Sequence, residues 1–237
     1  MKLTFPLIML LFFNIGHSQN NTTCVYGVKK NEVAIKRDKN ESESLNFAKN
    51  LIDKALNKSD KLKYLLVYND KESIFKLKNN LAEDTEENQR FLKLVEVMVA
   101  TGIYYQNLYE NLILHEFEVF GEEFLTHQPL KNSNWNITKK KKKIGKYICY
   151  KAINICESCN DKNIIEVWFT PDIPVPFGPM GYGGLPGLII EVKKKRVTLT
   201  LIEINNTNTL KIKKPKKGRY LTLQEYKKIA KDIRSHY

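Results

Sequence analysis

The stretch between Trp168 and Ile190 constrains the fold of this chain more than any other part of the sequence. It holds five of the 8 prolines and five of the 11 glycines in 237 residues. Proline fixes φ and lacks an amide hydrogen, whereas glycine permits positive φ, so such a stretch forms neither a helix nor a regular central strand. The sequence therefore predicts a rigid, irregular loop that leads into a short apolar strand, Leu188–Ile190.

Apolar residues recur at helical spacing in three other segments. Asn40–Asn57 and Thr85–Ala100 each carry an apolar stripe, which predicts two helices in the N-terminal half. A third helix is expected to begin at Thr222, because Thr222 and Glu225 have the spacing of a capping box.

Strand patterns occur at Thr23–Lys29, Lys61–Tyr68 and Glu72–Leu77, and a series of short strands is predicted from Ile103 onward. The loops between them have hairpin length, so neighbouring strands are expected to be antiparallel. We therefore predict an α+β fold that is mainly antiparallel β. Its form is a strongly curved, half-barrel-like β-meander with two N-terminal helices and one C-terminal helix. No repeat or linker divides residues 19–237, so we expect a single domain.

The first 18 residues have the three parts of a secretory signal peptide. Lys2 precedes an apolar segment, Phe5–Ile15, and the small residues Gly16 and Ser18 lie before an expected cut at Gln19. The apolar segment is short for a membrane span. The sequence thus predicts export to the periplasm, the cell envelope or the medium, with no membrane-spanning segment after cleavage.

All four cysteines lie in the exported part, where an even number favours disulfides. Four cysteines allow three pairings. The spacing of Cys156 and Cys159 fits a redox pair, half of a zinc site or a small ring that closes a turn, and we favour the ring. Cys24 and Cys149 then remain as the second predicted pair.

The formal charge of +13 is concentrated in the second half of the chain. The lysine-rich runs are Lys139–Lys143, Lys193–Arg196 and Lys211–Arg219. Such runs can bind nucleic acid, anionic lipid or acidic glycan. Lysines at turns and edge strands, however, are more often solvated and discourage edge-to-edge pairing. We favour that interpretation and expect no nucleic-acid partner.

The proline- and glycine-rich stretch resembles a known family. Residues Gly184–Ile189 read Gly-Leu-Pro-Gly-Leu-Ile, which matches letter for letter the name motif of the GLPGLI family of exported proteins from Bacteroidetes-type bacteria. The resemblance covers most of the exported part and is strongest over residues 135–192. It implies an envelope protein with a largely antiparallel β fold, and it supplies no reaction. The residues of the structural motif are Gly178, Pro179, Gly184, Leu185, Pro186, Gly187, Leu188 and Ile189.

No pattern typical of a hydrolase, a metalloprotease or a nucleotide-binding loop occurs in the sequence. We therefore predict no catalytic residue, no metal and no cofactor. His115, Glu116 and Glu118 are acid–base types within one strand, but charged residues on the solvent face of a strand are far more common than paired catalytic carboxylates.

We therefore expect a non-catalytic binding or carrier protein. Its peptidic or apolar ligand would lie in a groove beside the proline- and glycine-rich loop. The residues predicted to line this groove are Trp168, Phe177, Tyr182 and Leu185. Two alternatives remain open: an accessory partner of an outer-membrane transport or peptidase system, and a hydrolase with a site that no motif marks. The loop can also be structural, in which case Gly184 and Gly187 are the positions most expected to need positive φ or close backbone approach.

Overall fold

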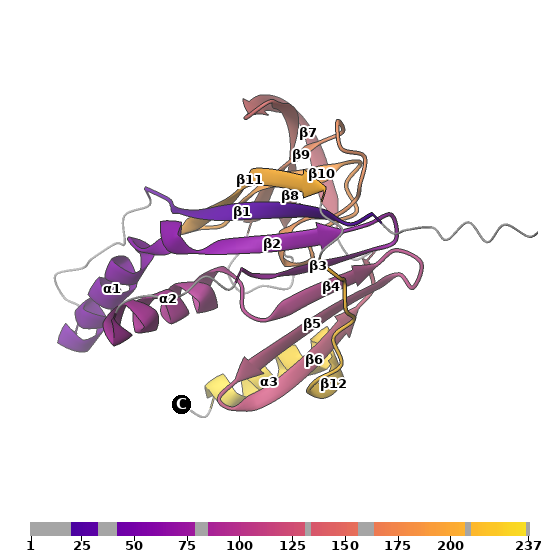
Figure 1. The fold of residues 1–237 in the computed structure, drawn as a ribbon. Coiled ribbons are helices and arrows are strands. Elements are labelled where there is room, and N and C mark those ends of the chain that lie inside the picture. The colour runs from indigo at the N-terminus through magenta and orange to yellow at the C-terminus, as the bar shows by residue number, and fades with distance from the viewer. Residues whose placement is uncertain are drawn as a thin grey trace, which may run out of the picture.

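The computed structural model describes residues 20–32, 42–78, 85–130, 134–155, 164–206 and 210–235. Within them, twelve strands form one sheet in the order β12-β6-β5-β4-β3-β2-β1-β11-β10-β9-β8-β7 (Figure 1). The strands are β1 (Thr22–Lys30), β2 (Lys63–Tyr68), β3 (Glu72–Leu77), β4 (Ile103–Asn107), β5 (Leu112–Val119), β6 (Glu122–Gln128), β7 (Trp135–Ile144), β8 (Tyr147–Ile155), β9 (Ile164–Thr170), β10 (Leu188–Lys193), β11 (Val197–Asn206) and β12 (Arg219–Thr222).

The sheet consists of two meanders that meet in its middle. Strands β1 to β6 form one meander and β7 to β11 form the other, and the two join where β1 pairs with β11 along its whole length. That pairing runs from Thr22 opposite Asn206 to Lys30 opposite Val197. The last strand, β12, pairs with β6, and this is the one parallel pair among the described strands.

This arrangement corrects the predicted fold class. The sheet is mixed and open, with β12 and β7 as its two edges, so the strongly curved half-barrel was wrong. The prediction treated the strands as one run of neighbours. Instead, the first strand lies in the centre of the sheet, and the last strand returns to an edge beside β6.

Three helices flank the sheet: α1 (Glu43–Leu56), α2 (Glu86–Val99) and α3 (Leu223–Ser235). The side chains of Ser42 and Thr85 cap α1 and α2. At α3 the expected capping box forms, because the Thr222 amide donates to Glu225 and the Glu225 amide donates to the Thr222 hydroxyl. Helices α1 and α2 lie together at one end of the molecule, and α3 lies against the β5–β6 end of the sheet (Figure 1).

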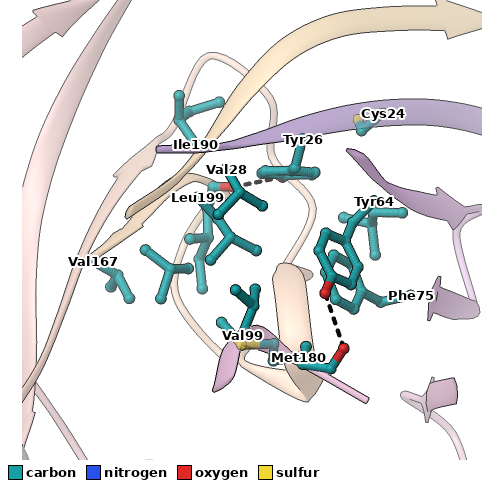
Figure 2. Packing of buried hydrophobic residues seen from close by; sticks show 14 of the residues in the cluster. Cys24, Tyr26, Val28, Tyr64, Phe75, Val99, Val167, Met180, Ile190 and Leu199 are labelled. Carbon is teal, nitrogen blue, oxygen red and sulfur yellow. Dashed lines mark hydrogen bonds between the residues drawn. The ribbon is translucent and has the colours of Figure 1, made fainter. Parts of the chain in front are cut away.

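One face of the sheet, here called the inner face, carries the main hydrophobic core. Figure 2 shows Tyr26 and Val28 of β1, Tyr64 of β2 and Phe75 of β3 in this core, together with Met180 from the loop between β9 and β10. The rings of Tyr64 and Phe75 stack with centroids 5.2 Å apart. The hydroxyls of these two tyrosines have partners, since Tyr26 donates to the carbonyl of Ile189 and Tyr64 to that of Ala100.

The predicted Cys24–Cys149 disulfide is absent, because both residues are buried free cysteines. The strand register gives the reason. Cross-strand neighbours share a face, and the pairs that run from Val28 on β1 to Ala152 on β8 place Ala152 on the inner face with Cys24. Cys149 is three residues before Ala152 and therefore lies on the opposite, outer face.

Some predictions concern residues outside the described part of the chain. The signal peptide and its cut at Gln19 fall there, and so does the Cys156–Cys159 pair. Among the helices that are described, none combines the length and apolar character needed to cross a membrane.

Candidate functional site

The loop of residues 171–187, here called the Gly/Pro loop, connects β9 to β10 and packs against the inner face. It contacts β3, β4 and β5 through the short helical turn Pro179–Gly181. Two side chains hold its backbone from other strands: Gln106 donates to the carbonyl of Gly181 at 3.0 Å, and Trp135 donates to that of Gly183 at 2.8 Å. The loop is therefore a part of the core that side-chain hydrogen bonds attach to both meanders.

Two glycines in this loop adopt the conformations expected from the sequence. Gly184 has φ of +81° and Gly187 has φ of +155°, both in the region that favours glycine. A Cβ at Gly187 would overlap the carbonyl oxygen of Thr170, whereas a Cβ at Gly184 would meet nothing within 4 Å. Positive φ was thus predicted correctly at both positions, and only Gly187 also lies against another backbone.

The structure does not bring the four predicted ligand-binding residues to one cleft. Phe177 and Leu185 are buried in the core, with 0% and 2% of their surface exposed. Tyr182 is partly buried beside Trp135, and burial raises its pKa to about 12. Trp168 points to the outer face, because alternation along β9 puts it opposite its neighbour Val167.

On the outer face, Trp168 lies within a network of charged side chains. The ammonium of Lys142 is 4.3 Å from the ring centroid of Trp168 and forms an ion pair with Glu191 at 2.7 Å. Lys151 forms an ion pair with Glu166, which also accepts a hydrogen bond from the indole of Trp168. Burial opposes ionisation of Glu166, but these hydrogen bonds outweigh it and lower its pKa. The indole is 8% exposed and offers little surface to a ligand.

The lysine-rich runs do not form one basic face. Lys139–Lys143 lies on β7 at one edge of the sheet, whereas Lys211–Arg219 leads into β12 at the other. One lysine of the second run, Lys214, forms an ion pair with Glu110, and the backbone amides of Lys216 and Lys217 donate to the carboxylate of Glu116. This distribution favours the interpretation of lysines as solvated edge residues.

Two of the three acid–base candidates on β5, His115 and Glu116, have structural partners. His115 lies between the rings of Tyr104 and Phe117, at centroid distances of 3.8 and 4.3 Å. Burial lowers the pKa of His115 to about 4, so the imidazole is neutral near pH 7. Glu116 faces the other way and holds the backbone before β12. No cluster of three metal-binding side chains was found among the described residues.

A pocket that sequence reasoning missed lies between α3 and the β5–β6 hairpin. It has a volume of about 320 Å³, and we call it the α3 pocket. Its lining residues are Val119, Phe120, Glu122, Phe124, Tyr226, Ile229, Ala230 and Ile233. Of these residues, Tyr226 packs on Phe117 and Phe124, with ring centroids 4.9 and 5.3 Å apart.

The turn at the mouth of this pocket has an unusual residue. Phe120 and Gly121 have φ of +51° and +82°, the pattern of a type I′ hairpin turn, in which Asn or Asp before Gly is preferred. Here the residue before the glycine is a phenylalanine, and 94% of the surface of Phe120 is exposed. Positive φ is strained for a bulky side chain, and such strain is found most often at functional sites. A phenylalanine before glycine between alternating strands was the sequence pattern that could have indicated it.

The comparisons with known proteins agree with the fold and leave the activity open. A family model described as a protein of unknown function (Porph_ging), from a Bacteroidetes-associated family, matches residues 157–191, the stretch that contains the Gly/Pro loop. No match was found among curated proteins.

Two crystal structures of PNGF-II have a similar fold. The one in space group C2 has a TM-score of 0.51 and 14% identity, and the one in P21 has a TM-score of 0.53 and 15% identity. The match covers 89% of this chain in both cases, but only 32% and 33% of the PNGF-II chains. The present chain therefore spans about a third of the length of those proteins, and the likeness concerns the fold alone.

Proposed function

We propose that this chain is an exported cell-envelope protein that binds an apolar ligand in the α3 pocket without converting it. The observation that carries the proposal is the pocket, in which seven of the eight lining residues are apolar. Its 320 Å³ lies at the lower end of the range for small-molecule sites. It is also roughly twice the volume of a cavity that accepts benzene in an engineered protein core.

The proposal keeps the binding role expected from the sequence and moves its place. A groove beside the Gly/Pro loop would need exposed rings, and Phe177 has none of its surface exposed. The α3 pocket, in contrast, is bordered by Phe120 and Ile233, which are 94% and 47% exposed. Apolar surface of this kind is more stable when a ligand covers it.

The non-catalytic part of the proposal is supported by the roles of the polar side chains nearby. His115 is stacked between two rings and Glu116 is bound to backbone amides, so neither is free to act on a ligand in the pocket. Glu122 is the one charged residue in the lining.

Export and membership of the GLPGLI family are further parts of the proposal. Their support is the three-part N-terminus, the six residues Gly184–Ile189 and the match of residues 157–191 to a Bacteroidetes-associated family. N-terminal sequencing of the protein recovered from the envelope tests the export. A mature chain that begins at Gln19 is expected, and a mature chain that retains Lys2 would contradict it.

A titration with Nile red, a neutral dye that fluoresces in apolar surroundings, tests the binding site. The wild-type protein should bind the dye, and Ala230→Phe should not, because the added ring fills the pocket. Ile202→Phe is the matched control, since Ile202 is 56% exposed on β11 and away from the pocket. Dye binding that is unchanged in Ala230→Phe, or absent from the wild type, would overturn the proposed site. Circular dichroism confirms that each variant is folded.

A further inference from the structure

The tip of the β5–β6 hairpin carries three carboxylates without partners in the described part of the chain. Glu118, Glu122 and Glu123 are all exposed, and none of them forms an ion pair or a hydrogen bond there. Glu118 lies directly opposite Glu123 across the two strands, and like charges in that position destabilise a hairpin. Arg219 follows on β12, in register with Phe124, and it pairs with none of the three.

Three unpaired carboxylates close together are unusual in a strongly basic protein. A chain with a formal charge of +13 has many lysines that could neutralise three carboxylates. Glu116, two residues before Glu118, differs from the three, because its carboxylate accepts hydrogen bonds from the backbone amides of Lys216 and Lys217. Three carboxylates are thus gathered at the hairpin tip, beside the α3 pocket.

The carboxylates lie on both faces of the hairpin. Glu122 is opposite Val119, and these two residues line the α3 pocket. Glu118 and Glu123 form the next pair and therefore project to the other face. Phe120 lies between the two sets, at the turn itself. A single small molecule in the pocket would reach Glu122 alone, whereas a chain of several residues can cross the turn and reach all three.

We propose that the α3 pocket and the hairpin tip together bind a peptide segment in which a large apolar side chain is flanked by Lys or Arg. This proposal rests on the proposed function and names its ligand class. The apolar side chain enters the α3 pocket beside Ile229 and Ile233, and the flanking cations pair with Glu118, Glu122 and Glu123 around Phe120. Complementary charge at the rim of an apolar site mainly sets partner choice and association rate.

Fluorescence anisotropy with a labelled heptapeptide tests this ligand class. The probe has one phenylalanine between pairs of lysines, and its counterpart has glutamates in place of the lysines. The test variant is Glu118→Gln/Glu122→Gln/Glu123→Gln. The matched control is Glu43→Gln/Glu87→Gln/Glu203→Gln, which changes the net charge equally at exposed positions elsewhere. Each protein is also titrated with Nile red.

At low ionic strength, the wild type and the control should bind the lysine peptide, and the test variant should bind it roughly tenfold more weakly. Nile red binding should be the same in all three, and the glutamate peptide should bind to none. Equal affinity of the test variant and the wild type for the lysine peptide would overturn the ligand class and leave the pocket intact. If the wild type does not bind Nile red, the proposed function is instead refuted.

Discussion

The Gly/Pro loop and the β5–β6 hairpin each have a phenylalanine at an irregular part of the backbone, but the one in the loop is buried and the one in the hairpin is exposed. Phe177 in the loop has 0% of its surface exposed, and Phe120 in the hairpin has 94% exposed. The loop is conspicuous in the sequence because prolines and glycines crowd there, whereas the hairpin is not. In this protein, the prolines and glycines that stand out in the sequence fix the path of a buried loop. The residues that border the pocket do not stand out in the sequence.

The difference follows from what proline and glycine do. They determine which backbone conformations are available, so a dense group of them marks a segment whose path is constrained. Gly187, whose added Cβ would overlap the Thr170 carbonyl, is such a constraint. Whether a ring faces water depends on the elements packed over it, and these lie far away in the sequence.

Gly187→Val should have the largest effect on the loop. Its positive φ and the overlap with the Thr170 carbonyl should cost about 5 kcal/mol of unfolding free energy. Gly184→Ala is the control, because only its φ is unfavourable and the expected cost is about 1 kcal/mol. Thermal and urea unfolding measure both. If Gly187→Val were as stable as Gly184→Ala, the loop would not have the constraint described here.

Phe177→Ala should destabilise the protein by about 3–5 kcal/mol, because it leaves a cavity in a fully buried site. Phe120→Ala should change stability by about 0.5 kcal/mol or less, since the ring it removes is exposed. Urea unfolding of the pair compares the two regions directly. Similar costs for the two substitutions would remove the distinction between a core loop and a surface hairpin.

His115 connects the two regions, because its ring lies between Tyr104, near Gly181 of the loop, and Phe117, which packs on Tyr226 of α3. Burial lowers its pKa from 6.5 to about 4. The unfolded chain therefore binds the proton more tightly, and the stabilising effect of the neutral imidazole is present above pH 6.5 and declines as the pH falls to 4.

The decline should reach about 3 kcal/mol by pH 4. In His115→Gln this component should disappear, while the carboxylates titrate as in the wild type. Unfolding free energies of both proteins across this range measure the difference. Parallel pH profiles would show that the imidazole is solvated.

Phe120→Asn should have a small effect of the opposite sign. Asn before Gly suits the type I′ turn and removes an exposed aromatic ring, so stability should rise by about 1 kcal/mol. Binding of Nile red and of the lysine peptide should weaken at the same time. A variant that is more stable and still binds with wild-type affinity would show that Phe120 has no part in the site.

The helices and local hairpins could be predicted from the sequence, because the residues that determine them lie close together in the chain. The capping box of Thr222 and Glu225 spans four residues, and it forms as predicted. The central position of β1 was not accessible, because its partner β11 lies more than 160 residues away and no local pattern encodes that pairing. The half-barrel prediction failed at this point.

The residues that border the α3 pocket were not predicted, for a related reason. Alternation along β9 alone could have placed Trp168 on the face opposite Val167, and it would have removed one of the four proposed ligand-binding residues. The burial of Phe177 and Leu185 depends on the loop folding back onto β3 to β5, and the α3 pocket depends on where the C-terminal helix docks. Neither follows from spacing in the sequence.

Methyl NMR during a titration with Nile red tests the central claim most directly, since it reports both regions in one experiment. The methyl groups of Val119, Ile229 and Ile233 around the α3 pocket should shift as the dye binds. Those of Leu185 and Leu188, in and after the Gly/Pro loop, should not shift, because they are buried in the core. Shifts at Leu185 and Leu188 with none at Ile229 and Ile233 would contradict the account and return the binding site to the loop.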